Sequence, residues 1–220
     1  MGQYYDWINL DKKEYICPSD FSYGNKLYES SWSWNPVLTA LYELLDSDWK
    51  GDDIIFLGDY AEVEDIDNPA LNKLFDQFCE HKGEGLVEIY DYELEYYKCI
   101  SGLFKAAEDE VRYEIEWMVE NDDFEFNQYR VDKRDPYKGL FERDGKQFRY
   151  TINDTKKEFF NIEETQSYER DGIVFHYNPL HILLCYARYV EPGAWLGDNI
   201  RVSNDRPDGD YTDISKDIVI

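Results

Sequence analysis

The chain carries four short blocks of sequence twice, in the same order. Each pair shares identical residues, such as Ile-Asn and Lys-Lys-Glu in the first pair and Trp-x-Gly-Asp in the third. The four matching pairs are QYYDWINLDKKEYI (3–16) with QFRYTINDTKKEFF (147–160), WNPVLTALYELL (34–45) with YNPLHILLCYAR (177–188), WKGDDII (49–55) with WLGDNIR (195–201), and GDYAEV (58–63) with GDYTDI (209–214). Four blocks in one order predict two copies of one folding unit, which limits the chain to folds that need the same local structure twice.

Each copy predicts a hairpin followed by a helix. In the first copy, an alternating segment (4–9) runs through a polar turn (11–12) into a second apolar segment (15–16). Asn35 and Asn178 each precede a proline, which is the pattern of a helix N-cap with proline at the first helical position. The apolar faces expected on these helices are Val37, Leu38, Leu41, Leu44 and Leu45 in the first copy, and Leu180, Leu183, Leu184 and Ala187 in the second.

The Trp-x-Gly-Asp segments predict a tight corner after each helix. Gly51 and Gly197 permit a turn with positive φ, and the following aspartate can bond backbone N–H groups beyond it. Trp49 and Trp195 are expected to hold the corners against the core. The segment 53–60 (DIIFLGDY) predicts a short buried strand that ends in a second turn. We therefore interpret the repeated motif as structural rather than catalytic.

The segment between the copies has a different composition. Two predicted helices carry apolar stripes: Leu71, Leu74, Phe75 and Phe78 in PALNKLFDQFCEH, and Val111, Ile115 and Met118 in EDEVRYEIEWMVENDDFE. The segment GLVEIYDYELEYY (85–97) is ambiguous between strand and helix. The predicted fold class is α+β: two related hairpin-helix-strand units, 1–63 and 147–220, packed about a pseudo-twofold axis in one compact body, with an acidic, mainly helical insertion at 64–146.

The charge of the chain restricts its partners. Its 48 acidic and 23 basic side chains give a formal net charge of -25. Nucleic acid and anionic membranes would be repelled, whereas a basic protein would be attracted. No apolar run is long enough to cross a bilayer.

The cysteines and the N-terminus predict a cytoplasmic protein. Cys17, Cys79, Cys99 and Cys185 lie far apart and include no Cys-x-x-Cys pair, so neither a zinc knuckle nor a redox dithiol is predicted. The start MGQYYDW lacks the basic and apolar regions of a signal peptide. We expect free thiols in a reducing compartment.

Sequence motifs for catalysis or cofactor binding are weak. The segment 53–65 (DIIFLGDYAEVED) is superficially similar to a metallophosphoesterase strand, but His81, His176 and His181 do not stand in the contexts that such a di-metal site needs. The acidic residues of 204–213 lack EF-hand spacing. We predict no metal site, catalytic residue or cofactor, although acid/base pairs often leave no local signature and the class of enzyme stays open.

The acidic segment from Glu108 to Glu125 is the most unusual feature. A charge run of this kind is most often a solvated helix face. Its functional interpretation is a surface that imitates nucleic-acid phosphates or neutralises a basic patch, with interleaved aromatic residues as anchors. Those aromatics are Tyr113, Trp117, Phe124 and Phe126. The predicted partner-binding residues are Glu114, Glu116, Trp117, Glu120, Asp122 and Asp123.

The blocks GQYYDWINLDKKEYI, KLYES and W-x-GD-x-I…GDY carry a resemblance to known sequences. They resemble a scattered set of uncharacterised bacterial and phage or viral proteins that begin with Gly-Gln-Tyr-Tyr. The resemblance covers roughly residues 2–60, and a weaker similarity begins at residue 147. It implies no activity and no catalytic residues, and its scattered occurrence is compatible with toxin immunity or anti-defence work.

We therefore hypothesise an acidic, non-enzymatic protein that binds and inhibits a basic or nucleic-acid-binding partner. One alternative is a small-molecule binder or metal-dependent hydrolase in a cleft between the units, where Asp52 and Asp198, or Asp59 and Asp210, would meet. A metal-dependent rise in melting temperature would favour that alternative. Another is a structural subunit with a self-complementary apolar patch. The sequence leaves the oligomeric state open.

Overall fold

The computed structural model describes residues 3–62, 67–82, 94, 96–125 and 127–218. The α-helices are α1 (Pro36–Asp46), α2 (Pro69–Lys82), α3 (Glu108–Asn121) and α4 (Leu180–Leu183). The strands are β1 (Tyr5–Asn9), β2 (Glu14–Ile16), β3 (Ile54–Gly58), β4 (Lys98–Cys99), β5 (Tyr150–Asn153), β6 (Glu158–Asn161), β7 (Ser167–Arg170), β8 (Ile173–His176), β9 (Cys185–Tyr186), β10 (Ile200–Ser203) and β11 (Thr212–Asp213). The mixture of helices with mainly antiparallel sheets confirms the α+β prediction. Most of the ambiguous segment 85–97, the boundary at 63–64 and Phe126 lie outside the described residues.

Two sheets have corresponding strand orders. The first sheet runs β4-β2-β1-β3-β9 and the second runs β11-β6-β5-β10. In each sheet an antiparallel hairpin, β1–β2 or β5–β6, pairs with a later antiparallel strand on one side and a short parallel strand on the other. The predicted hairpins are therefore present. Common origin of the two units by duplication stays a prediction.

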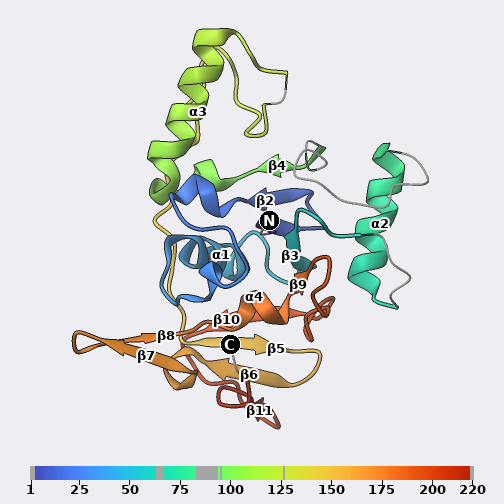
Figure 1. The fold of residues 1–220 in the computed structure, drawn as a ribbon, viewed down its shortest axis with the longest axis vertical. Helices are drawn as coiled ribbons and strands as arrows, with labels where there is room; N and C mark the ends of the chain where they lie inside the picture. Colours follow the sequence, from blue (N-terminus) through green and yellow to red (C-terminus); the bar gives the residue numbers. More distant parts are fainter. Residues whose placement is uncertain (1–2, 63–66, 83–93, 95, 126, 219–220) are drawn as a thin grey trace.

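Helix α1 lies between the two sheets, with α4 beside it (Figure 1). The Asn35 side chain accepts a 2.8 Å hydrogen bond from the backbone N–H of Leu38, as expected for an N-cap. In the middle of the helix, the buried Tyr42 hydroxyl bonds Thr151 Oγ1 at 2.9 Å and accepts from Asn178 Nδ2 at 2.5 Å. A buried polar network thus ties α1 to β5 of the second sheet and to the segment that precedes α4.

The helix predicted in the second copy is wrong beyond Leu183. Only one helical turn forms, and β9 then pairs in parallel with β3. The backbone N–H of Gly193 bonds Cys185 O at 2.8 Å, and a side chain at Gly193 would collide with the Leu183 backbone at 2.3 Å. A run of apolar residues such as 180–187 is compatible with either a helix or a buried strand. Pairing with the free edge of β3 makes Cys185 and Tyr186 a strand.

The fourth pair of sequence blocks does not correspond in space. Gly58 ends β3, whereas Gly209 precedes β11, which pairs with β6. The strand that holds the equivalent place beside β2 is β4, and its sequence YKCIS (97–101) matches YTDIS (211–215). Strand β4 belongs to the first sheet although the sequence places it in the insertion.

Matching hydrogen bonds support this revised correspondence. In the first unit, Lys98 N bonds Lys13 O at 2.9 Å, Ile100 N bonds Tyr15 O at 2.9 Å, and Cys17 N bonds Ser101 Oγ at 3.0 Å. The three corresponding bonds of the second unit are Thr212 N to Lys157 O at 2.8 Å, Ile214 N to Phe159 O at 2.9 Å, and Asn161 N to Ser215 Oγ at 2.8 Å. Each unit therefore uses a Tyr-x-x-Ile-Ser segment to cover the outer edge of its hairpin.

The insertion adds two amphipathic helices, α2 and α3, whose buried residues belong to the same hydrophobic core as the first sheet. Helix α2 buries Leu71, Leu74, Phe75 and Phe78, and α3 buries Val111, Ile115 and Met118, as their spacing predicts. Helix α3 stands at one end of the molecule, with a long loop returning beside it (Figure 1). Among the described residues, none of the helices has the length and apolar character required to span a membrane.

Candidate functional site

The two Trp-x-Gly-Asp corners have the same internal contacts. Gly51 and Gly197 adopt φ of 81° and 78°, as the turn requires. The indole N–H of each buried tryptophan donates to a glutamate of the hairpin: Trp49 to Glu14 at 3.0 Å, and Trp195 to Glu158 at 2.8 Å. The predicted positive φ of both glycines and the predicted burial of both tryptophans are confirmed.

The corner aspartates are engaged within their own units. Asp52 accepts a 2.7 Å bond from Asn9 and pairs with Lys12, while Asp198 accepts a 2.8 Å bond from Asn153. Elsewhere, Asp59 accepts from the backbone N–H of Tyr4 at 3.1 Å. Within the described residues no cluster of three metal-ligating side chains occurs. Asp52 and Asp198 are thus each held by an asparagine of their own hairpin.

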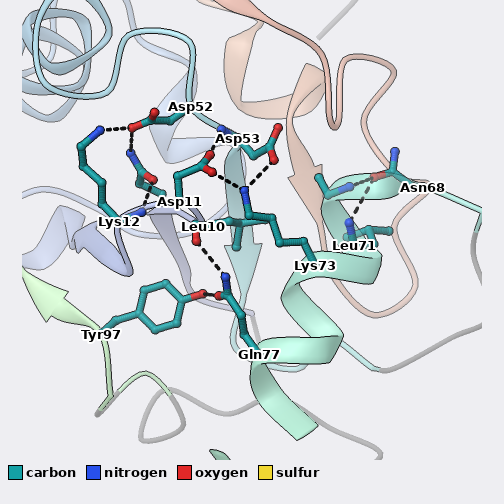
Figure 2. A network of polar contacts seen from close by, with 12 residues as sticks. Leu10, Asp11, Lys12, Asp52, Asp53, Asn68, Leu71, Lys73, Gln77 and Tyr97 are labelled. Carbon is teal, nitrogen blue, oxygen red and sulfur yellow. Dashed lines mark hydrogen bonds and ion pairs between the residues drawn. The ribbon is translucent and has the colours of Figure 1, made fainter. Parts of the chain in front are cut away.

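Lys73 of α2 links the first corner to the insertion. Its ammonium group pairs with Asp11 and, at 2.9 Å, with Asp53, while Gln77 one turn later donates to Leu10 O at 2.8 Å and accepts from Tyr97 (Figure 2). Burial raises the pKa of the Asp11 carboxyl, but hydrogen bonds from Lys73 and the backbone outweigh it and leave the pKa lowered. The network orients α2 against the hairpin turn.

Replacing Lys73 by methionine should lower the free energy of unfolding by about 1 kcal/mol at neutral pH, since both ion pairs are partly exposed. A carboxyl with a lowered pKa stabilises the fold above its unfolded pKa and loses that contribution as pH falls through its folded pKa. The difference between Lys73→Met and wild type should therefore shrink below about pH 4. Urea titrations at pH 7 and pH 3 test this, and a constant difference would contradict it.

All six predicted partner-binding residues are exposed on α3 or its C-terminal end. Three of them, Glu114, Trp117 and Asp123, lie together around a hollow of about 180 Å³. The remaining three are separate: Glu116 accepts a 3.4 Å bond from Tyr137, Asp122 pairs with Lys133 at 2.9 Å, and Glu120 is exposed. We call these six residues the α3 surface. The structure thus divides it into a carboxylate–indole hollow and three acidic residues that do not line that hollow.

The end of α3 is fixed by its backbone. Asp122 has φ of 51°, and the N–H of Asp123 bonds Met118 O at 3.0 Å, as in a left-handed helix cap. The negative end of the helix macrodipole lies there, and no basic side chain occupies the last turn. Placing Glu120, Asp122 and Asp123 at this end costs stability and concentrates negative potential.

A second hollow of about 340 Å³ adjoins the first through Glu114, Gln128 and Tyr129. Asp20 lies in its wall and accepts from Tyr129 Oη at 2.9 Å and Cys99 Sγ at 3.1 Å. Burial raises the pKa of the Asp20 carboxyl against the hydrogen bonds that lower it. Sequence reasoning missed these residues, because a single aspartate in PSDF and a return loop carry no recognisable motif.

Comparisons of the chain with protein-family models, with curated proteins and with solved structures each gave no match.

Proposed function

We propose that the protein binds a basic protein partner through the α3 surface and thereby blocks the partner's basic, nucleic-acid-binding face. The observation that carries the proposal is the exposed indole of Trp117, which lines one hollow together with the carboxylates of Glu114 and Asp123. Carboxylates beside an aromatic face are a favourable environment for a guanidinium or ammonium group.

The charge distribution supports the same proposal. A net charge of -25 accelerates encounter with a basic partner, and the acids at the C-terminal end of α3 strengthen the local field. The buried stripe of Val111, Ile115 and Met118 accounts for the stability of the helix without those acids. Their position on an exposed end is better suited to binding than to folding.

A matched pair of triple variants tests the proposal. The variant Glu114→Lys/Glu120→Lys/Asp123→Lys reverses three of the five negative charges of the α3 surface. The variant Asp205→Lys/Asp208→Lys/Asp210→Lys makes the same change of net charge on an exposed loop before β11. Basic proteins captured from host lysate at low salt should be lost with the first variant and kept with the second. The affinity of the purified partner should fall about 100-fold or more, because like charges would face each other.

Two results would contradict the proposal. Equal loss with both variants would indicate unspecific attraction, and equal retention would place the interface elsewhere. Trp117→Ala, which leaves the charge unchanged, should cost about 2 kcal/mol of binding if the indole is an anchor. Circular dichroism should be unchanged for all variants, since every replaced side chain is exposed.

A further inference from the structure

The β7–β8 hairpin projects from the molecule at a distance from α3 (Figure 1). Its two strands pair only with each other among the described strands, and nearly all of their side chains are exposed. The base of the hairpin is held to the body: Ser33 N bonds His176 O at 3.1 Å, and the Trp32 ring packs on Tyr177 with centroids 4.9 Å apart. The hairpin is therefore an anchored arm whose outer part lies in solvent.

An aromatic hollow of about 420 Å³ lies between the arm and the body. Its lining residues are Tyr23, Trp32, Ser33, Trp34, Asn35, Tyr168, Arg170 and Phe175. Trp34 is 41% exposed and adopts φ of 65°, and Tyr168 and Phe175 are 48% and 39% exposed. A tryptophan held in the left-handed region and open to solvent is costly for folding alone, which is typical of residues that bind something.

The polar groups of this hollow are nearly all committed within the fold. Asn35 caps α1 and donates to Trp32 O at 2.6 Å, and Ser33 Oγ donates to His176 O. Arg170 is the one charged residue among the described lining residues, and no carboxylate lines the hollow. Its 3.6 Å pair with Asp171 is highly exposed and therefore weak. In a chain of net charge -25, this hollow is locally apolar and cationic.

The strand register places the apolar and cationic parts of the hollow in a row. Tyr168 pairs with Phe175, and Arg170 is two residues further along β7. Residues two apart on a strand share one face, about 7 Å apart. Beyond the pairing with β8, the described residues place no strand on the outer edge of β7, so the backbone N–H and C=O groups that face this edge are available for pairing.

We propose that β7 and the aromatic hollow bind an extended segment of another protein by strand addition. The segment runs parallel to β7 and places an apolar or aromatic side chain against Trp34, Tyr168 and Phe175, and a carboxylate two residues later against Arg170. Its recognition pattern is therefore aromatic-x-Glu or aromatic-x-Asp. A second copy of this chain is a poorer occupant, because two bodies of net charge -25 repel each other.

The test uses the full chain and a fluorescein-labelled peptide, Thr-Val-Phe-Thr-Glu-Val-Thr, in fluorescence anisotropy. Replacing Glu by Lys in the peptide, or Phe by Ser, should weaken binding at least about tenfold. Arg170→Glu should weaken binding of the Glu peptide by a similar factor and improve binding of the Lys peptide. Trp34→Ser should weaken all of the peptides that carry Phe.

Two exposed residues elsewhere supply matched controls. Arg134→Glu makes the same charge change as Arg170→Glu, and Tyr189→Ser removes an exposed aromatic ring as Trp34→Ser does. Both controls should bind like wild type. No peptide binding, equal binding of the Glu and Lys peptides, or equal effects of control and test variants would overturn the proposal. Sedimentation showing a dimer that Arg170→Glu dissociates would assign the face to a second copy and would also overturn it.

Discussion

Replacing Trp49 or Trp195 by alanine is expected to lower the free energy of unfolding by about 3–5 kcal/mol. Both side chains are fully buried, and Trp195 stacks on Phe160 with centroids 5.8 Å apart. Each truncation removes a large apolar surface, opens a cavity and leaves the hairpin glutamate without its indole donor. The two corners have the same geometry, so the two losses should be of similar size.

Urea unfolding monitored by far-UV circular dichroism measures these losses. Trp34→Ala and Trp117→Ala provide matched controls, since both indoles are exposed and should change stability by less than about 0.5 kcal/mol. Replacing Trp49 by phenylalanine keeps much of the volume but removes the bond to Glu14, so it should cost less than alanine. A small effect at either buried tryptophan would show that its corner is not needed to hold the core.

His181 is expected to make the fold less stable as pH falls from 7 to 4. The ring is fully buried, its Nδ1 lies 2.8 Å from Asn178 O, and Nε2 has no hydrogen-bond partner among the described residues. The Nδ1–H therefore donates to the carbonyl, and protonation of Nε2 would bury a charge together with an unmatched donor. Burial lowers the pKa of His181 to about 4, against a smaller opposing effect of the Asn178 bond.

The sign follows from the direction of that pKa shift. Below pH 6.5 the imidazole of His181 takes up a proton in the unfolded chain but stays neutral in the folded chain. The contribution of neutral His181 to the free energy of unfolding is therefore complete above pH 6.5 and falls as the pH is lowered toward 4. A shift from 6.5 to about 4 corresponds to about 3 kcal/mol. Comparing the pH dependence of wild type with that of His181→Gln isolates this residue from carboxylates that titrate in the same range.

Thermal and urea unfolding at pH 7, 5.5 and 4 provide the measurement. The gap in stability between wild type and His181→Gln should change by about 3 kcal/mol over this range, in the direction that favours the variant at low pH. His176→Gln is the matched control, because that ring is only partly buried. Parallel pH profiles for wild type and His181→Gln would show that the buried ring is protonated without cost.

The two proposed binding surfaces can be tested independently. The α3 surface and the β7–β8 arm lie on different parts of the molecule (Figure 1), and no residue belongs to both. One is acidic with a single indole, and the other is aromatic with a single guanidinium. Loss of binding at either surface would leave the prediction for the other intact.

The amino-acid sequence by itself determined the local elements of this protein. Period-two alternation specified the hairpins, the Asn-Pro pair specified the start of α1, and Trp-x-Gly-Asp specified both corners, because each depends on residues close together in the chain. Helical spacing likewise predicted which side of α3 is buried, and with it the exposure of the six partner-binding residues.

Only the tertiary structure decided where short segments pair. The two-residue strands β4, β9 and β11 have too few residues for any periodicity, and their conformation depends on edges supplied by distant strands. The same holds for Asp20, which becomes a buried carboxyl only when Cys99 and Tyr129 are brought beside it, and for the aromatic hollow between the arm and the body. Contacts between residues about a hundred positions apart depend on how the elements pack, so a local sequence pattern does not predict them.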